Sequence, residues 1–246
     1  MRGSRLPLLC ALAVAAAAPG AFAQPYPSRA IRLIVAFAPG GSVDPVARLV
    51  GAKLGEALGE RFVIDNRPGA GGNLSAELAA RSAPDGYTLH ICSAPLVVNV
   101  SLYRKVGYDP VKDFAPVTLL ANVQNVPVSH PSLPAKNVKQ LIALSSIRAA
   151  KINALAVAGG KRSPALPGFE VSTGCPVLAP AGTPKPILER VNKEIAAVLR
   201  IREVNERLVS QGVEPVGSTP GELAAHIQAD IPKWAKVVKI SGARVD

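Results

Sequence analysis

The residues best suited to ligand chemistry are glycines and small polar residues that follow predicted strands. The stretch Ile31–Val50 reads IRLIVAFAPGGSVDPVARLV. Its β-branched start, Ile31–Phe37, is typical of a buried strand, and the glycines of Ala38–Ser42 let the backbone approach a ligand without a Cβ in the way. Asp44-Pro45 predicts a helix start, with Asp44 as the N-cap acceptor. Free N–H groups at such a helix end suit an anion, so this turn is a candidate binding site.

The same turn lacks the signatures of other ligand or catalytic loops. It has neither the G-x-G-x-x-G dinucleotide fingerprint nor the Lys-Ser/Thr of a P-loop. Ser42 does not lie in a G-x-S-x-G elbow, so the turn does not indicate catalysis. Many glycine-rich turns between strand and helix bind nothing, and a purely structural turn is the alternative interpretation.

Two further segments repeat this pattern along the chain. The second strand, Arg61–Ile64, precedes the glycine-rich DNRPGAGGN, in which Asn73 is the predicted N-cap of a helix through Arg81. The third strand, Tyr87–Cys92, ends at Ser93. Because the carboxyl ends of parallel strands meet at one edge of an α/β sheet, the three loops together predict a pocket of backbone donors.

The beginning of the chain resembles a secretory signal peptide. A short basic start precedes the apolar run Leu6–Ala18, and Ala21-Phe22-Ala23 predicts cleavage after Ala23. We therefore expect an exported, periplasmic protein. The net charge of +11 is spread over single basic residues, which argues against nucleic acid and fits acidic small molecules.

Cysteine and histidine usage indicates neither a metal nor an enzyme. Cys92 and Cys175 remain after cleavage, and we favour two unpaired, buried thiols over a disulfide. Metal-ligand spacings are absent from the sequence, so no metal and no cofactor are predicted. The three histidines, His90, His130 and His226, are expected in structural or surface roles; a hydrolytic pair of Asp44 with His90 is a minor alternative.

Two other conspicuous side chains have structural interpretations. Arg67 is expected to pair with Asp65 or Asp85 and not with a ligand, and Trp234 is expected to pack in the last helix. The remaining strands are predicted at Phe114–Ala121, 123–128, 152–158, 169–179 and 213–216, and the remaining helices at 137–149, 183–199, 203–211 and 219–239.

Seven segments, read in order, carry a family resemblance: FAPGGSVDPVAR, DNRPGAGGN, APDGYTL, YDPVKDFAPVTLLA, KRSPALP, LAPAGTPKPI and EPVGSTP…KWAKVV. They resemble the tripartite tricarboxylate transporter receptors, the Bug-type extracytoplasmic solute-binding proteins. The resemblance implies an α/β fold of the type II periplasmic-binding-protein kind, with two lobes and mostly parallel sheets. It also implies a monomer that captures a small carboxylate, an organic acid or amino acid, for the membrane permease subunits of a tripartite transporter.

The resemblance also implies which residues hold the ligand. By position, these are Phe37, Ala38, Pro39, Gly40, Gly41 and Ser42 of the first loop, Ala70, Gly71, Gly72 and Asn73 of the second, and Ser93. Asp44 is assigned to capping the helix near the site. The implied organisation is a signal peptide (1–23), the first part of lobe 1 (24–120), lobe 2 (121–176), and a return to lobe 1 with C-terminal helices (177–246).

The second lobe departs from the family pattern. Ser145–Arg148 runs almost directly to Lys151–Val157, where members have several dozen more residues, and a shorter gap falls near Phe169. Gly174-Cys175 replaces residues that are usually aromatic. We therefore expect a shortened second lobe, and the alternative to a working receptor is a remnant that no longer binds.

Overall fold

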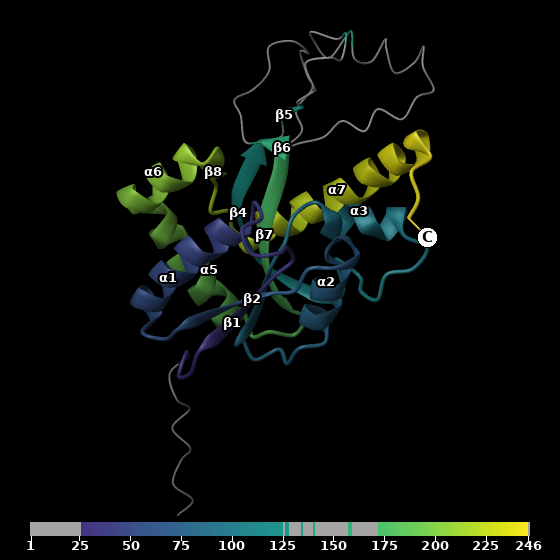
Figure 1. Ribbon diagram of the computed structural model, residues 1–246. Coiled ribbons are helices and arrows are strands. Elements are labelled where there is room, and N and C mark those ends of the chain that lie inside the picture. Colours follow the sequence, from purple (N-terminus) through teal and green to yellow (C-terminus); the bar gives the residue numbers. More distant parts are fainter. Residues whose placement is uncertain are drawn as a thin grey trace, which may run out of the picture.

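The computed structural model describes residues 26–124, 126–127, 134, 140, 157–158 and 172–245 (Figure 1). These residues form a six-stranded sheet in the order β2-β1-β3-β7-β4-β8 and a two-stranded ladder, β5-β6. Several predictions concern residues outside this description: the signal peptide and its cleavage site, His130, and the helix at 137–149. Of the segment predicted for lobe 2, the structure describes β7, its first residues up to 127 and isolated positions between them.

The parallel half of the sheet confirms the three successive strand–loop–helix units. Strand β1 pairs in parallel with both β2 and β3. The elements of these units are β1 (Ile31–Val35), α1 (Asp44–Leu58), β2 (Phe62–Asn66), the 3-10 turn η1 (Ala70–Gly72), α2 (Asn73–Ala80), β3 (Thr88–Ile91) and α3 (Pro95–Leu102).

The other half of the sheet is antiparallel, so the sheet as a whole is mixed and not mostly parallel. Strand β7 pairs antiparallel with β3 and β4, and β8 pairs antiparallel with β4. The chain runs out of the sheet along β4 and comes back along β7, which reverses the strand direction. The elements are β4 (Phe114–Gln124), β5 (Val126–Pro127), β6 (Val157–Ala158), β7 (Ser172–Pro180), α5 (Lys185–Arg200), α6 (Arg202–Ser210), β8 (Val213–Pro215) and α7 (Pro220–Ser241).

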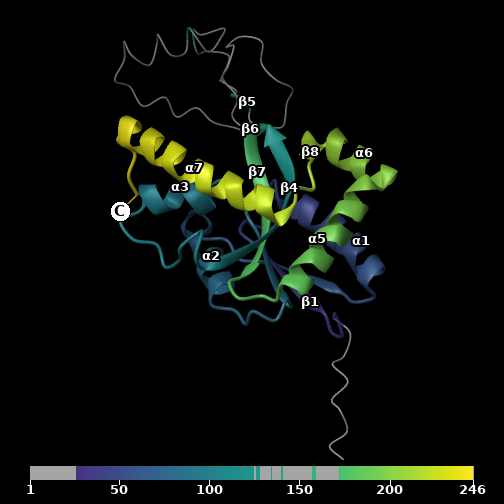
Figure 2. The ribbon, with the colours of Figure 1, turned by 180° about the vertical axis from the view of Figure 1, so that it is seen from behind.

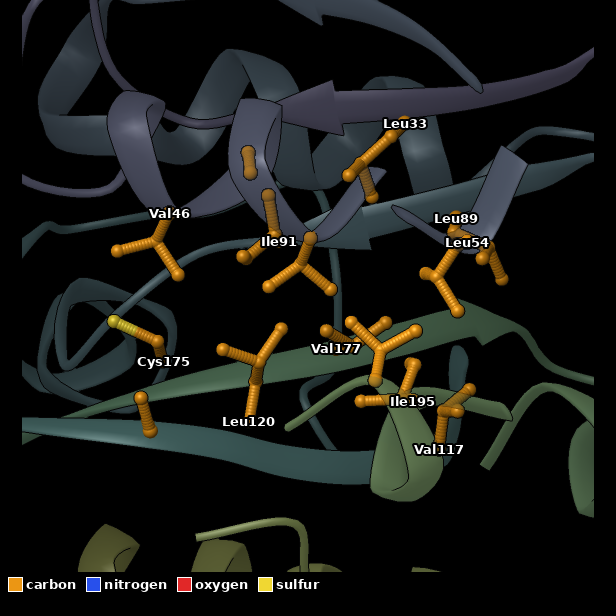
Figure 3. Packing of buried hydrophobic residues seen from close by; sticks show 14 of the residues in the cluster. Leu33, Val46, Leu54, Leu89, Ile91, Val117, Leu120, Cys175, Val177 and Ile195 are labelled. Atoms are coloured by element: carbon orange, nitrogen blue, oxygen red, sulfur yellow. The ribbon is translucent and has the colours of Figure 1, made fainter. Parts of the chain in front are cut away.

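Helices cover both faces of the sheet. Helices α1, α5 and α6 lie on one face and α2, α3 and α7 on the other, as the two opposite views show (Figures 1 and 2). The larger hydrophobic cluster fills the first interface and includes Leu33, Leu89, Leu120 and Ile195 (Figure 3). The smaller cluster, with Ile34, Leu96 and Leu223, fills the second. Neighbouring residues of β1 and of β7 therefore enter different clusters, as the pleat requires, whereas Leu120 and Ala121 of β4, at a register shift, both enter the larger one.

The last helix begins as its sequence predicts. Thr219 and Glu222 form a capping box: the Thr219 hydroxyl accepts from the Glu222 N–H at 3.2 Å and Glu222 Oε2 accepts from the Thr219 N–H at 2.8 Å. Pro232 lies inside the helix, as expected. None of the helices in the described part of the chain is long and apolar enough to cross a membrane.

Candidate functional site

A cavity of about 310 Å³ lies between the start of α1 and one face of the antiparallel strands. Strand register builds the wall opposite the helix, because Val123 of β4 lies across from both Thr173 of β7 and Val213 of β8. Cys175, two residues along β7, shares this face. The described residues that line the cavity are Gly40, Gly41, Ser42, Val43, Pro45, Ser93, Val123, Thr173, Cys175, Gln211 and Val213.

The helix end of the cavity offers hydrogen-bond donors. The Gly41 N–H donates to the Ala38 carbonyl at 3.0 Å, and the Gly40 N–H donates to Asp44 Oδ2 at 2.9 Å. The next two N–H groups, of Ser42 and Val43, have no partner among the described residues. They stand at the positive end of the 15-residue helix α1 and can receive an anion.

Asp44 fixes this turn, although it does not cap the helix as predicted. The N-cap is Val43, without a side-chain cap, and Asp44 is the first helical residue. Its buried carboxylate, with the side chain 6% exposed, accepts hydrogen bonds from Gly40, Arg48 and Asn66. The prediction failed because the carboxylate binds the preceding turn, Arg48 and the distant Asn66, and not the N–H groups of the helix. Burial alone would raise the pKa of Asp44, but the three hydrogen bonds and the Arg48 charge outweigh it and hold the pKa below its usual value.

Asn66, at the end of β2, links the first two strand–loop units and had no predicted role. Its Nδ2 donates to the Phe37 carbonyl at 3.0 Å and to Asp44 Oδ1 at 2.9 Å. Its Oδ1 accepts from Arg48 Nη2 at 3.1 Å. The sequence signal was limited to the position of Asn66 after a strand, which does not identify its partners. One amide thus holds both the carbonyl that precedes the glycine turn and the carboxylate beneath it.

The second glycine loop is anchored to α3 and lines a different surface. Gly72 is the N-cap of α2, so the predicted cap Asn73 is instead the first helical residue. Its Oδ1 accepts from Asn99 Nδ2 at 2.8 Å and from the Tyr108 hydroxyl at 3.3 Å, and these bonds replace the expected cap. Ala70 has φ of +46°, which is uncommon for a residue with a Cβ. Residues 70–73 do not line the 310 Å³ cavity, and their part in ligand binding stays a prediction.

Ser93 lies where two hollows meet. It lines the 310 Å³ cavity, and it also lines a much smaller pocket with Gly174, His226 and Asp230. In that pocket His226 Nε2 is 3.5 Å from Asp230 Oδ2, one helical turn away on α7. The Ser93 hydroxyl has no hydrogen bond to the described residues, so it remains available to a ligand in either hollow.

His90 is a structural residue of β3 and does not meet Asp44. It is 1% exposed, its Nε2 lies 3.1 Å from Ser75 Oγ, and its ring stacks on Phe114 at 5.9 Å between centroids. Its Nδ1 is buried without a partner. Burial lowers the pKa of His90 to about 3, so the ring is neutral near pH 7. Asp44 and His90 each have other partners, which removes the proposed hydrolytic pair.

Other side chains have the structural roles that the sequence indicated. Arg67 Nε donates to Asp65 Oδ1 at 2.8 Å, and Trp234 packs partly buried against the smaller cluster. Cys92 and Cys175 are free and buried. The register explains why they are unpaired: β3 and β7 place Cys92 beside Pro176, so the neighbouring Cys175 points to the other face of the sheet.

Four of the predicted site residues therefore line the cavity: Gly40, Gly41, Ser42 and Ser93. Phe37, Ala38 and Pro39 shape the turn behind it. Cys175 also lines it, at a position where the family resemblance implies residues that face the cleft. Sequence reasoning missed Val43, Pro45, Val123, Thr173, Gln211 and Val213. The last four come from strands and a helix end that only long-range pairing brings to α1, and no local pattern marks them.

The solved structures most informative for this fold are periplasmic binding proteins. The periplasmic binding protein BugD matches with a TM-score of 0.76 and 26% identity, over 89% of this chain and 99% of that one. Rpa4515 of R. palustris, solved with adipate, gives 0.77 and 30% over 89% and 100%. MatC from Rhodopseudomonas palustris, solved with malate, gives 0.74 and 27% over 87% and 100%. The fold is thus that of a periplasmic solute-binding protein.

Sequence comparison gives the family. A family model described as the tripartite tricarboxylate transporter family receptor matches residues 46–161. Protein BugT from Bordetella pertussis is 30% identical, over 95% of this chain and 96% of its own length. This chain belongs to the tripartite tricarboxylate transporter receptor family, as its motifs indicated.

The chain is shorter than these relatives. Its alignment with BugT spans 312 positions, whereas the chain has 246 residues, so at least 66 positions (312 less 246) face no residue here. This agrees with the expected loss of chain length, while the place of the loss within the second lobe stays a prediction.

Proposed function

We propose that this protein is a periplasmic receptor that binds a small carboxylate and delivers it to the membrane permease of a tripartite transporter. The observation that carries the proposal is that Ser42 and Val43 line a cavity at the start of α1 and that their N–H groups have no partner among the described residues. The Ser42 and Ser93 hydroxyls add donors beside them. Neutral donors at a helix end suit a carboxylate head group.

The related structures support the same ligand class. Rpa4515 was solved with adipate and MatC with malate, and both are carboxylates. The first glycine loop, Phe37–Ser42, and Ser93 would hold the carboxylate, with Ala70–Asn73 contributing from the second loop, in part through bridging water. The protein would act as a monomer without enzymatic activity, after export and cleavage behind Ala23.

Binding is tested by isothermal titration calorimetry and thermal unfolding of residues 24–246 with mono-, di- and tricarboxylates. A ligand at about a hundred times its Kd should add about 2.7 kcal/mol to the free energy of unfolding. One acid that gives both heat and a raised Tm supports the receptor. Folded protein that binds no carboxylate would instead support the alternative of a shortened remnant, which the missing chain length motivates.

Ser42 provides a matched pair of variants. Ser42→Asp places a negative charge where the carboxylate head would lie and should abolish binding by repulsion. Ser42→Asn has a neutral side chain of the same size and should retain binding. An acid at a helix N-terminus is itself favourable, so the ligand-free Ser42→Asp protein should be as stable as the wild type. Equal binding by both variants would exclude this end of the cavity as the carboxylate site.

A further inference from the structure

The wall of the cavity opposite the donors is mostly apolar, although Thr173 of β7 also belongs to it. Val123, Cys175 and Val213 are 9%, 0% and 4% exposed and belong to the same hydrophobic cluster that packs under α1. Figure 3 shows Cys175 at one edge of that cluster, with its sulfur turned toward the side where Val46 of α1 lies. The cavity therefore lies between the larger hydrophobic cluster and the glycine turn.

The charged groups near the glycine turn are already paired with each other. Asp44 and Arg48 form an ion pair at 3.0 Å beneath the turn. Among the described residues that line the cavity none is charged, and Gln211 is the polar residue supplied by the end of α6. A carboxylate can thus be received at the donor end, but a second one would lie against valine side chains. Burying an ionised carboxylate without a partner is costly.

From this polarity we infer that the cavity selects monocarboxylates with an apolar body over di- and tricarboxylates. The inference rests on the proposed function and adds the class of acid. The carboxylate would occupy the donors of Ser42 and Val43, and the hydrocarbon part would lie on Val123, Val213 and Cys175. A volume of about 310 Å³ accommodates a short acyl chain or a small ring.

Hexanoate and adipate form the sharpest test, because they share six carbons and differ only in the second carboxylate. Calorimetric titration of the 24–246 protein should give a Kd for hexanoate at least about tenfold lower than for adipate. Adipate binding as tightly as hexanoate would overturn the inference and leave the proposed function standing. Binding of neither acid, nor of any other carboxylate in the panel, would instead overturn the proposed function.

A gain-of-charge variant tests the geometry directly. Gln211→Arg supplies a cation at the apolar end, and it should bring the adipate Kd to or below that of hexanoate. Gln228→Arg is the matched control, since Gln228 is an exposed residue of α7 outside the cavity. It should leave the hexanoate-to-adipate ratio unchanged. An unchanged ratio in folded Gln211→Arg would contradict the placement of the hydrocarbon at that end.

A second variant tests the apolar wall itself. Val213→Thr keeps the size of the side chain and replaces a methyl group by a hydroxyl. It should raise the Kd of hexanoate severalfold and leave the Kd of acetate unchanged, because acetate reaches only the donor end. Equal weakening of both acids would indicate that the wall does not contact the hydrocarbon part, and it would count against the inference.

Discussion

At the scale of single residues, Asp44 connects the start of α1 to β2 and fixes the conformation of the glycine turn. Its carboxylate accepts a hydrogen bond from the N–H of Gly40, whereas the N–H groups of Ser42 and Val43 have no partner among residues 26–124 and 172–245. The Arg48 guanidinium and the Asn66 amide supply the compensation that a buried carboxylate needs. Asp44, beneath the turn, thus determines which N–H groups of the turn are available for the proposed carboxylate.

Asp44→Asn should reduce the free energy of unfolding by about 1–3 kcal/mol at pH 7, because it removes a charged acceptor from three donors. The pKa of Asp44 is lowered from 3.8 in the folded state, so its stabilising contribution is present above that value and is lost as the pH falls through the folded pKa. Urea unfolding at pH 7 and pH 3 measures both effects. A difference between variant and wild type that does not shrink at pH 3 would contradict the ionic role.

His90 should make the protein sensitive to acid. Its pKa is 6.5 when unfolded and about 3 when folded, so between these values the unfolded chain binds a proton that the folded protein does not. Stability therefore falls as the pH decreases from 6.5, and this one group removes about 2 kcal/mol between pH 7 and pH 5.

The measurement compares urea unfolding of the wild type and His90→Leu at pH 7 and pH 5. Between pH 7 and pH 5 the free energy of unfolding of His90→Leu should fall by about 2 kcal/mol less than that of the wild type, because this variant lacks the titrating ring. Ser75→Ala is the control, because it removes the hydroxyl 3.1 Å from His90 Nε2 but keeps the titrating ring. Its acid sensitivity should match the wild type; equal sensitivity in all three proteins would disprove the role of His90.

Residue roles with local partners could be predicted from the sequence, and roles with distant partners could not. The pairing of Arg67 with a nearby carboxylate, Asp65, and the start of α7 at Thr219-Pro220 were predicted, whereas the Glu222 half of the capping box was not. Asp44 and Asn73 were both assigned as caps because their residue types favour that position. Asp44 instead binds Asn66, and Asn73 binds Asn99. Each partner is at least 20 residues away, so local sequence rules do not identify it.

At the scale of elements, the periodic segments were predictable and their partners in the sheet were not. The strand at Ile31, the helices at Lys185 and Pro220 and the strand at Phe114 appear within a few residues of their predicted positions. The antiparallel insertion of β7 between β3 and β4 depends on long-range pairing, from Gln124 with Ser172 to His90 with Leu178. The hydrophobic pattern of the sequence does not give the register of such pairs. The apolar cavity wall arises from that insertion, so it could not be predicted either.

The long β4–β7 pair leads to a prediction about folding. Its last register pair joins Gln124 to Ser172, and the described members of both hydrophobic clusters lie in 26–124 and 172–245. A chain in which an Asn-Gly turn replaces residues 125–171 should therefore fold and unfold cooperatively in urea. Circular dichroism and a denaturation curve measure this. Loss of cooperative unfolding would show that the replaced segment is needed for the core.

At the scale of the whole molecule, the fold and the family were within reach of the sequence because many moderately specific motifs occur in one order. The family model and the BugT relationship confirm that assignment. The ligand class beyond "carboxylate" was not within reach, because it depends on the wall formed by β4, β7 and β8. The same shortened variant, lacking 125–171, also tests where the ligand is recognised: retained hexanoate binding would assign recognition to residues 24–124 and 172–246.

The position of the cavity wall has a consequence for how such receptors diverge. Val123, Thr173 and Cys175 lie on the two strands through which the chain leaves and re-enters the sheet, close to the last register pair. We expect insertions or deletions beyond that pair to leave the register of β4 with β7 unchanged. Relatives can therefore differ in chain length there and keep the cavity wall that we propose to discriminate among acids. Binding of the acid and its delivery to the permease can then evolve separately.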